Sequence, residues 1–292
     1  MVKHGPLKLI ITMRYLLILF FGLLANSIFA QTLLEGYLKG VDEEPVAFAS
    51  ISNKSGKYGV ISNIHGCFYL DQELFKDSVL VISCIGFQTQ EIQLSRFVQY
   101  PIIVLEKKNY SIEEISIVSQ KRKLIKVKDK GKVDATYKGA AGAEVITLVK
   151  GPADKTLNEI TFFCRKQVEK AYVGIRIYAV NSLNQPGENL LQSEIVVPIK
   201  KGDTNITYNL INENILIPKK GLFVGIQFMG NPNVIDEQDC KKCNKFGPYV
   251  FYSNQFDEIR TYRTFFHNSF VKEKYPWKNT YLNLMCSYSY FN

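Results

Sequence analysis

The sequence predicts an all-β protein built from two sandwiches. From residue 34 onward, short apolar runs recur at close spacing, and clusters of Gly, Pro, Asn, Asp and Ser separate them. Short strands punctuated by turn residues are typical of sandwiches. The 292 residues suffice for about two domains, and a Lys-rich stretch interrupts the apolar runs. We therefore expect one sandwich at residues 31–106, a basic linker at 107–140 and a second sandwich at 141–292.

Residues 1–30 have the features of a secretory signal peptide. Basic residues precede the apolar run 15–24, and the small residues Ser27 and Ala30 stand where a signal peptidase cleaves. The run is about ten residues long, against the roughly 20 needed to cross a bilayer as a helix. Residue 31 is Gln rather than the Cys that a lipid anchor requires. We expect cleavage, no transmembrane span afterwards, and a protein that is periplasmic, secreted or at the periphery of the outer membrane.

The first sandwich is expected to contain seven strands. Residues 59–62 and 67–70 predict a hairpin joined by the turn 63–66, in which Gly66 tolerates a positive φ. Residues 78–85 are almost wholly apolar, which predicts a strand buried on both faces. No segment of this unit has a helical period. The expected strands are 34–39, 46–51, 59–62, 67–70, 78–85, 90–94 and 101–105.

Several motifs in this unit stand in the order found in a known family. Gly36, Pro45 and Ala49 come first, followed by Ser-Asn-Ile-His-Gly-Cys-Phe-Tyr-Leu at 62–70 and Leu-Val-Ile-Ser-Cys-Ile-Gly-Phe at 80–87. Together they resemble the carboxypeptidase-like regulatory domain, which occurs in secreted metallocarboxypeptidases and at the front of outer-membrane receptors in Bacteroidetes-type bacteria. The resemblance covers about residues 32–106. It implies a seven-stranded, transthyretin-like β-sandwich, and it implies no activity.

The linker at 107–140 is strongly basic, with most of its charge at 121–132. One interpretation is a solvated linker with one or two edge strands. The other is an electrostatic contact with anionic lipid or lipopolysaccharide, because clustered Lys and Arg are attracted to anionic surfaces. Removal of the signal peptide takes away three basic residues, which lowers the formal charge from +9 to +6.

Strand patterns resume in the second unit. Ile160, Phe162 and Cys164 alternate with Thr161 and Phe163. In 172–179 apolar residues alternate with Tyr172, Gly174, Arg176 and Tyr178, and residues 221–228 are apolar on both faces. The segments Arg-Ile-Tyr at 176–178, Gln-Pro-Gly-Glu at 185–188 and Ile-Pro-Lys-Lys-Gly-Leu-Phe-Val-Gly-Ile at 217–226 are similar to jelly-roll domains that accompany the regulatory domain in Bacteroidetes proteins. The resemblance implies a jelly-roll-like β-sandwich without a settled activity.

The sequence gives no pattern for the catalytic sites considered. A zinc carboxypeptidase needs a His-x-x-Glu pair and a distant His. The three histidines are His4, His65 and His267, and the last two are followed at the third position by Phe. A Gly-x-Ser-x-Gly elbow and a phosphate-binding loop are also missing. Short acidic loops such as 236–239 are more often solvated or calcium-binding than catalytic, and no EF-hand spacing supports calcium at 236–239. We expect a protein that is not an enzyme and needs no cofactor or metal.

Cys240 and Cys243 form a Cys-Lys-Lys-Cys motif in the polar loop 236–245. Export favours a disulfide between them. Free thiols, or metal or redox chemistry, remain alternatives. Zinc would need a second ligand pair, and a redox pair would need a helix after the first sulfur. The other four cysteines, Cys67, Cys84, Cys164 and Cys286, lie in apolar runs, where a free thiol behaves as a small hydrophobe.

Aromatic residues gather toward the C-terminus and provide the candidate ligand-binding residues. Trp277, Tyr275, Tyr249 and Tyr252 are expected near loops and strand ends, where a ring on a sandwich rim can stack on a sugar. The alternative is that they are ordinary strand residues, since aromatic side chains favour pleated, half-buried positions.

The expected function is therefore that of a non-catalytic, exported accessory protein of the cell envelope. Its expected partner is an envelope protein or the outer-membrane surface. The alternative is a carbohydrate-binding module that holds a glycan through rim aromatics, and a hydrolase has the least support. Nucleic acid is not an expected partner, because the basic charge would stand outside the cytoplasm.

Overall fold

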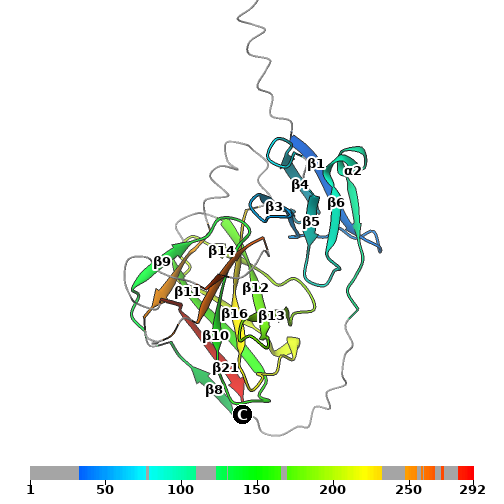
Figure 1. Ribbon diagram of the computed structural model, residues 1–292. Helices are drawn as coiled ribbons and strands as arrows, with labels where there is room; N and C mark the ends of the chain where they lie inside the picture. Colours follow the sequence, from blue (N-terminus) through cyan, green and yellow to red (C-terminus); the bar gives the residue numbers. More distant parts are fainter. Residues whose placement is uncertain are drawn as a thin grey trace, which may run out of the picture.

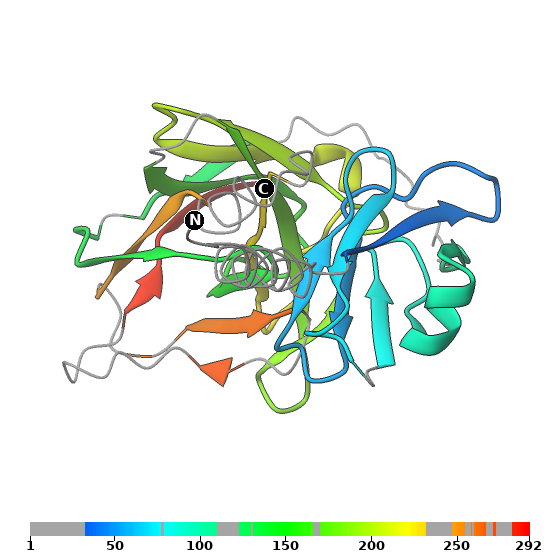
Figure 2. The same ribbon diagram turned by 90° about the horizontal axis from the view of Figure 1, so that it is seen from above.

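The computed structural model contains two β-units packed side by side (Figures 1 and 2). It describes residues 33–76, 79–109, 123–129, 131–165, 170–231, 247–254, 258, 260–266, 271–272 and 282–292. The predicted signal peptide, 1–30, lies outside the described residues. Strands dominate both units, which confirms the all-β prediction.

The N-terminal unit is a seven-stranded sandwich, as predicted. One sheet has the order β4-β1-β7 and the other the order β3-β2-β5-β6. Leu38, Phe68 and Ile82 are at most 2 % exposed and fill the space between the sheets. The strands are β1 (Leu33–Gly40), β2 (Ser50–Asn53), β3 (Gly59–Ile61), β4 (Cys67–Asp71), β5 (Val79–Ser83), β6 (Gln90–Gln93) and β7 (Ile102–Leu105).

The predicted hairpin at 59–70 is wrong in one respect. β3 pairs with β2, whereas β4 pairs with β1, so the turn 63–66 passes from one sheet to the other. The Asn63 side-chain oxygen accepts hydrogen bonds from the amides of His65 and Cys67, at 2.9 and 3.0 Å. Gly66 adopts φ 76°, as predicted for this position. The turn therefore sets the spacing between the two layers.

Two other details of this unit differ from the sequence prediction. In β5 only Leu80 and Ile82 are fully buried, so one face packs in the core and the other is partly exposed. A short helix, α2 (Leu94–Gln99), follows β6 and buries Phe97, which stacks on Phe68 with ring centres 5.5 Å apart. Six residues make fewer than two turns, which is too short for a helical period to show in the sequence.

The C-terminal unit is a jelly-roll-like sandwich of two seven-stranded sheets. Phe162, Val173 and Ile226 are 0 % exposed and lie in the core between them. The first sheet contains β10 (Ala143–Val149), β12 (Lys170–Val180), β13 (Pro186–Asn189), β14 (Val196–Lys200), β16 (Leu222–Gly230), β18 (Thr261–Phe265) and β19 (Val271–Lys272). The second contains β8 (Leu124–Val127), β9 (Ala135–Lys138), β11 (Leu157–Arg165), β15 (Asn205–Asn209), β17 (Tyr249–Ser253), β20 (Asn283–Leu284) and β21 (Cys286–Phe291).

Two strands of the second sheet come from the segment expected to be a linker, 107–140. β8 pairs with β21 and β9 pairs with β17. Ile125 and Val127 of β8 pack against the core of the second unit. The basic stretch is thus partly built into the second sandwich as edge strands.

The two units share a buried interface. Ile61 of the N-terminal unit clusters with Met229 and Phe266 of the C-terminal unit, and all three are at most 7 % exposed. The rings of Phe48 and Tyr172 meet across the boundary with centres 5.4 Å apart. An interface that is packed in this way holds the units in one orientation, because separation would expose its apolar side chains to water.

A charged network is buried in the first sheet, next to this interface. Arg176 is 1 % exposed, and its guanidinium donates a 2.6 Å hydrogen bond to Glu194 and another to the side-chain oxygen of Gln227. Its Nε lies 3.8 Å from Glu144, which accepts a hydrogen bond from the hydroxyl of Tyr178. The alternation in 172–179 placed Arg176 and Tyr178 on the face opposite to Ile175 and Ile177, and the structure buries both faces.

The network also reaches the N-terminal unit. Gln227 accepts from Arg176 through its oxygen and donates from its nitrogen to the Ser50 hydroxyl of β2, at 3.2 Å. Ser50 is 3 % exposed. This hydrogen bond between the two units helps to define their orientation, because separation of the units would break it and remove the partner of the Gln227 side-chain amide.

Replacing Glu144 with Gln is expected to change how stability depends on pH. Burial raises the pKa of Glu144 from its usual 4.5, although Arg176 and Tyr178 oppose the shift. The folded protein therefore holds this proton to higher pH than the unfolded chain, and wild-type stability falls as the pH rises through that interval. Relative to wild type, Glu144→Gln should gain free energy of unfolding as the pH is raised from 4 to 8 in urea titrations. A relative loss over the same interval would contradict the assignment.

Candidate functional site

Polar side chains stand in rows across the outer face of the second sheet. Strands β15, β11, β21 and β8 lie side by side in that order. Alternate residues of a strand point to opposite faces, so the residues between the members of these rows, such as Ile160 and Ile206, fill the core. The rows are Asn209–Glu159–Ser289–Lys126 and Thr207–Thr161–Ser287.

The members of these rows on β11, β21 and β8 line a hollow of about 430 Å³, which we call the sheet-face hollow. It lies within the range of small-ligand sites, roughly 300–1,000 Å³. Phe163 adds one aromatic ring to a lining that is otherwise mostly polar. The lining residues are Lys126, Val127, Lys128, Asp129, Glu159, Thr161, Phe163, Ser287, Tyr288 and Ser289.

Several polar groups of the hollow are held in place by the protein. The hydroxyls of Thr161 and Thr207 lie 3.0 Å apart. Ser287 accepts a 3.0 Å hydrogen bond from the backbone amide of Asp129, and Ser289 accepts a 3.1 Å bond from Asn158. A serine hydroxyl that accepts still has its own proton to donate. Ser287, which is partly exposed, can therefore donate to a ligand from a fixed position.

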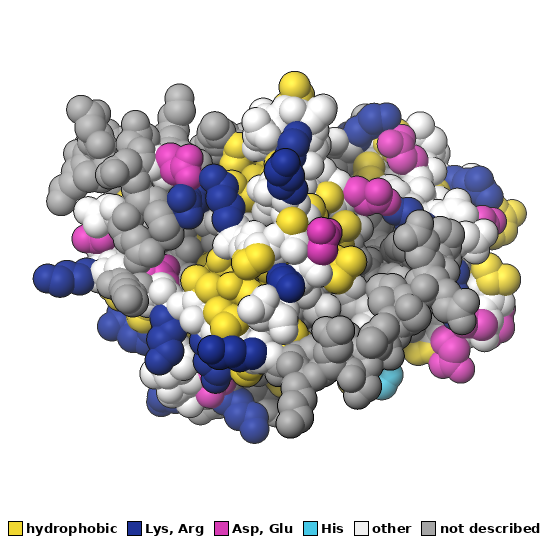
Figure 3. All heavy atoms as spheres, turned by 90° about the horizontal axis from the view of Figure 1, so that it is seen from below, with side chains coloured by type: hydrophobic (Ala, Val, Ile, Leu, Met, Phe, Trp, Pro, Cys, Tyr) yellow, Lys and Arg dark blue, Asp and Glu magenta, His cyan; other side chains and the backbone are white. Residues whose placement is uncertain are grey.

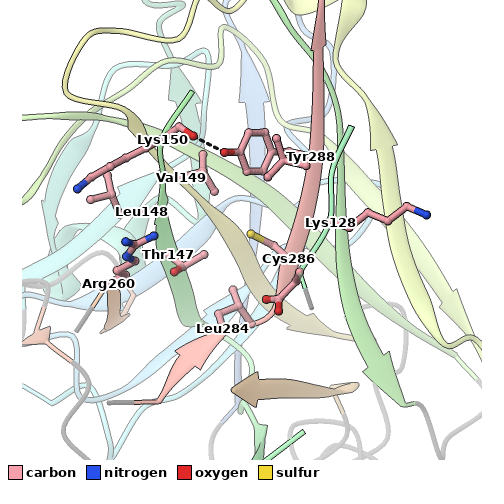
Figure 4. Close-up of a pocket in the computed structure, with 11 residues that line it drawn as sticks. Lys128, Thr147, Leu148, Val149, Lys150, Arg260, Leu284, Cys286 and Tyr288 are labelled. Atoms are coloured by element: carbon pink, nitrogen blue, oxygen red, sulfur yellow. Dashed lines mark hydrogen bonds between the residues drawn. The ribbon is translucent and has the colours of Figure 1, made fainter. Parts of the chain in front are cut away.

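A second cavity of about 200 Å³, the inter-sheet cavity, lies on the other side of β8 and β21. Thr147 and Val149 of β10 face Leu284, Cys286 and Tyr288 across it (Figure 4), whereas the side chain of Leu148 packs on the opposite face of β10. Lys128 lines both the cavity and the sheet-face hollow, and in Figure 4 its side chain points away from the cavity. The segment that carries Lys128 is thus a wall between the two spaces.

The inter-sheet cavity is not suited to nucleophilic chemistry at its cysteine. Burial raises the pKa of the Cys286 thiol well above its usual 9.0, and it raises the pKa of Tyr288 to about 12. The thiolate is the reactive form of cysteine, so this thiol stays inert near neutral pH. The Tyr288 hydroxyl donates to the backbone oxygen of Lys150 (Figure 4).

Charges at the mouth of the inter-sheet cavity are partly neutralised. Glu258 lies 2.8 Å from Arg260 and 3.8 Å from Lys150. Figure 3 views the end of the molecule where β8 and the C-terminus lie, and it shows Lys and Arg side chains around a patch of exposed hydrophobic side chains. Lys126 and Lys128 are exposed, and neither forms an ion pair with another described residue.

The candidate aromatic residues fall in different places. Tyr252 of β17 is 2 % exposed in the core and meets the ring of Tyr137 edge-on, so it has no free face for a sugar. Tyr249 is partly buried, and Lys138 lies 5.3 Å from the centre of its ring. Trp277, Tyr275, Cys240 and Cys243 lie outside the described residues.

The polar rows were not recognised from the sequence. The alternation of Thr161 and Phe163 against the buried Ile160 and Phe162 placed these residues on one face of a strand. The sequence does not show that this strand lies beside 205–209 and 286–291, because those pairings join distant segments. The sequence shows the residue types that form the rows, but it does not show which residues are neighbours across the sheet.

Within the described part of the chain, no group of three or more His, Cys, Asp and Glu side chains is placed to hold a metal ion. The helices described there include none that is long and apolar enough to cross a membrane.

Comparisons with known proteins identify the N-terminal unit. A search of curated proteins found no match. Two solved structures are remotely similar: the cysteine protease and lectin-like domains of Cwp84, a surface layer associated protein of Clostridium difficile (TM-score 0.35, 11 % identity), and infectious bursal disease virus Gx strain (TM-score 0.25, 8 % identity). Each alignment covers 89 % of this chain, and the chain spans 58 % and 55 % of those structures respectively. Residues 34–117 match the family model of the CarboxypepD_reg-like domain, which confirms the carboxypeptidase-like regulatory domain predicted for residues 32–106.

Proposed function

We propose that this protein is a non-catalytic, exported accessory protein of the bacterial cell envelope. It would bind an envelope protein or the outer-membrane surface, from the periplasm or the outer-membrane periphery or after secretion. The single observation that carries the proposal is the match of residues 34–117 to the CarboxypepD_reg-like domain. This domain packs through a buried interface against a second sandwich, which has the open, polar sheet-face hollow.

The hydrogen bonds in the hollow support binding rather than catalysis. A serine or threonine nucleophile needs a base within hydrogen-bonding reach. Thr161 instead meets the hydroxyl of Thr207, and Ser287 meets a backbone amide. In the described residues these hydroxyls are therefore held as hydrogen-bonding groups on a surface.

Localisation and partner can be tested in one preparation. The protein should fractionate with the envelope or the medium, and N-terminal sequencing should begin at Gln31. Cross-linking in the intact envelope, followed by mass spectrometry, should recover one reproducible partner or outer-membrane lipid. A full-length cytoplasmic protein would contradict export, and an envelope protein that cross-links to nothing reproducibly would contradict the accessory role.

Carbohydrate binding is a second candidate function, and the polar rows favour it. Sugars offer many hydroxyl groups together with apolar C–H faces, and the hollow combines hydroxyl and carboxylate groups with the ring of Phe163. Glycan-array binding by wild type, Phe163→Ala and Trp277→Ala would test this. Loss of glycan binding in Phe163→Ala would place the glycan on the sheet face. Loss of glycan binding in Trp277→Ala would place it at the aromatic site predicted from the sequence. If wild type binds no glycan on the array, carbohydrate binding is rejected.

A further inference from the structure

Lysine side chains stand along one side of the sheet-face hollow. In β8, Ile125 and Val127 pack toward the core, so Leu124 and Lys126 face outward, and Lys128 follows in the same alternation. Both lysines line the hollow. β8 and the residue that follows it thus bring two lysines to the edge of a site, where their ammonium groups can meet one ligand.

The middle of the hollow has a different chemistry. Glu159 can accept hydrogen bonds from ligand hydroxyls, and Thr161 and Ser287 can exchange hydrogen bonds in either direction. Neighbouring strands are about 4.8 Å apart, so the lining of the hollow, from β11 through β21 to β8, extends about 10 Å. That length accommodates a short chain of sugar rings, with hydrogen-bonding groups on successive strands.

Phe163 completes the lining with an apolar surface. It lies on β11 in the alternation of Glu159 and Thr161, two residues beyond Thr161, and it lines the same hollow. Aromatic rings contribute a large apolar contact with a fixed geometry. A ring next to hydroxyl and carboxylate groups matches a sugar, which has an apolar face and a polar rim.

We infer that the sheet-face hollow binds an acidic oligosaccharide, which is a sugar chain that carries carboxylate or phosphate groups. This inference rests on the second candidate function, glycan binding. The acidic group lies at the β8 side, where Lys126 and Lys128 are without a protein counter-ion among the described residues. The ring hydroxyls lie over Glu159 and Thr161. A ligand with a charge on every unit would be repelled by Glu159 and Asp129, the two acids of the lining, so sugar hydroxyls must supply part of the contact.

The ligand class is tested by calorimetry on the mature chain, 31–292, with four probes. Oligogalacturonate and a phosphorylated oligomannose carry the two kinds of acidic group, xylo-oligosaccharide is uncharged, and polyglutamate is acidic without sugar. We expect at least one acidic glycan to bind at least tenfold more tightly than the other two probes. Equal binding of xylo-oligosaccharide overturns the acidic class but leaves glycan binding intact. Equal binding of polyglutamate, or no binding to either acidic glycan, overturns the inference.

Matched variants locate the site. Lys126→Gln combined with Lys128→Gln should weaken binding about tenfold or more and flatten its salt dependence, because charge-assisted hydrogen bonds are lost. The control is Lys219→Gln with Lys220→Gln, an exposed pair outside the hollow, which should leave affinity unchanged. Equal weakening by both pairs shows attraction by net charge and overturns the site. Cross-linking to an envelope partner is measured separately, so the accessory role and this inference can fail independently.

Discussion

Arg176→Met is expected to lower the free energy of unfolding by about 3–5 kcal/mol, the usual cost of removing one partner from a buried ion pair. Arg176 is 1 % exposed and lies between the carboxylates of Glu194 and Glu144. Burial by itself lowers the pKa of the guanidinium, but these carboxylates more than offset it, and the pKa lies above its usual value. Without the arginine, the buried Glu144 and the partly exposed Glu194 have no cation beside them.

The experiment is equilibrium urea unfolding followed by circular dichroism, with Arg165→Met as control. Arg165 ends β11 at the exposed surface, with its guanidinium 5.8 Å from the centre of the Tyr249 ring, and its substitution should change the free energy of unfolding by less than about 1 kcal/mol. Adding Glu194→Gln to Arg176→Met should restore part of the loss, because the carboxylate closest to the guanidinium is then removed together with it. If Arg176→Met unfolds within about 1 kcal/mol of wild type, the guanidinium is not a buried counter-ion.

The same substitution is expected to loosen the interface between the units. Arg176 holds the side-chain oxygen of Gln227, whose nitrogen donates to Ser50 of the N-terminal unit. Without the guanidinium, the Gln227 amide is free to rotate, and its bond to Ser50 loses its fixed geometry. Limited proteolysis should then cut Arg176→Met faster between the units than Arg165→Met.

Local patterns in the sequence predicted much of the layer structure. The alternation around Ile160, Phe162 and Cys164 correctly placed these residues in a core, and the apolar run near Val224 correctly indicated a strand buried on both faces. Such patterns depend only on neighbours along the chain, and a strand has a period of two wherever one face is buried. The motifs at 62–70 and 80–87 likewise identified the CarboxypepD_reg-like domain.

The errors concern contacts between distant segments. The alternation showed that Arg176 shares a face with Tyr172 and Tyr178, but it did not show that the interface covers this face and that Arg176 is buried there in a network with Glu194 and Gln227. The turn 63–66 was read as a hairpin because β3 and β4 are adjacent in sequence, although each strand pairs with a different neighbour. The sheet-face hollow was missed for the same reason, since its rows combine β8, β11, β15 and β21.

Gly66→Ala is expected to destabilise the N-terminal unit by about 3 kcal/mol or more. Two costs combine at this position. Gly66 has φ 76°, and an alanine in this conformation costs about 1–2 kcal/mol of conformational free energy. The Cβ of the alanine would also stand 2.3 Å from the backbone oxygen of Leu38. The turn cannot easily move away, because the Leu38 amide donates a 2.9 Å hydrogen bond to the Gly66 oxygen. Relief of the clash must therefore break a contact between the turn and β1.

Gly202→Ala separates the two costs. Gly202 has φ 93°, also in the left-handed region, but a Cβ there would meet nothing within 4 Å. This variant should lose only the conformational cost, about 1–2 kcal/mol, in the same urea titration. The excess loss in Gly66→Ala then measures how tightly the turn is held against β1. Equal losses in the two variants would mean that the turn yields freely, and the turn would then not set the distance between the two sheets of the N-terminal unit.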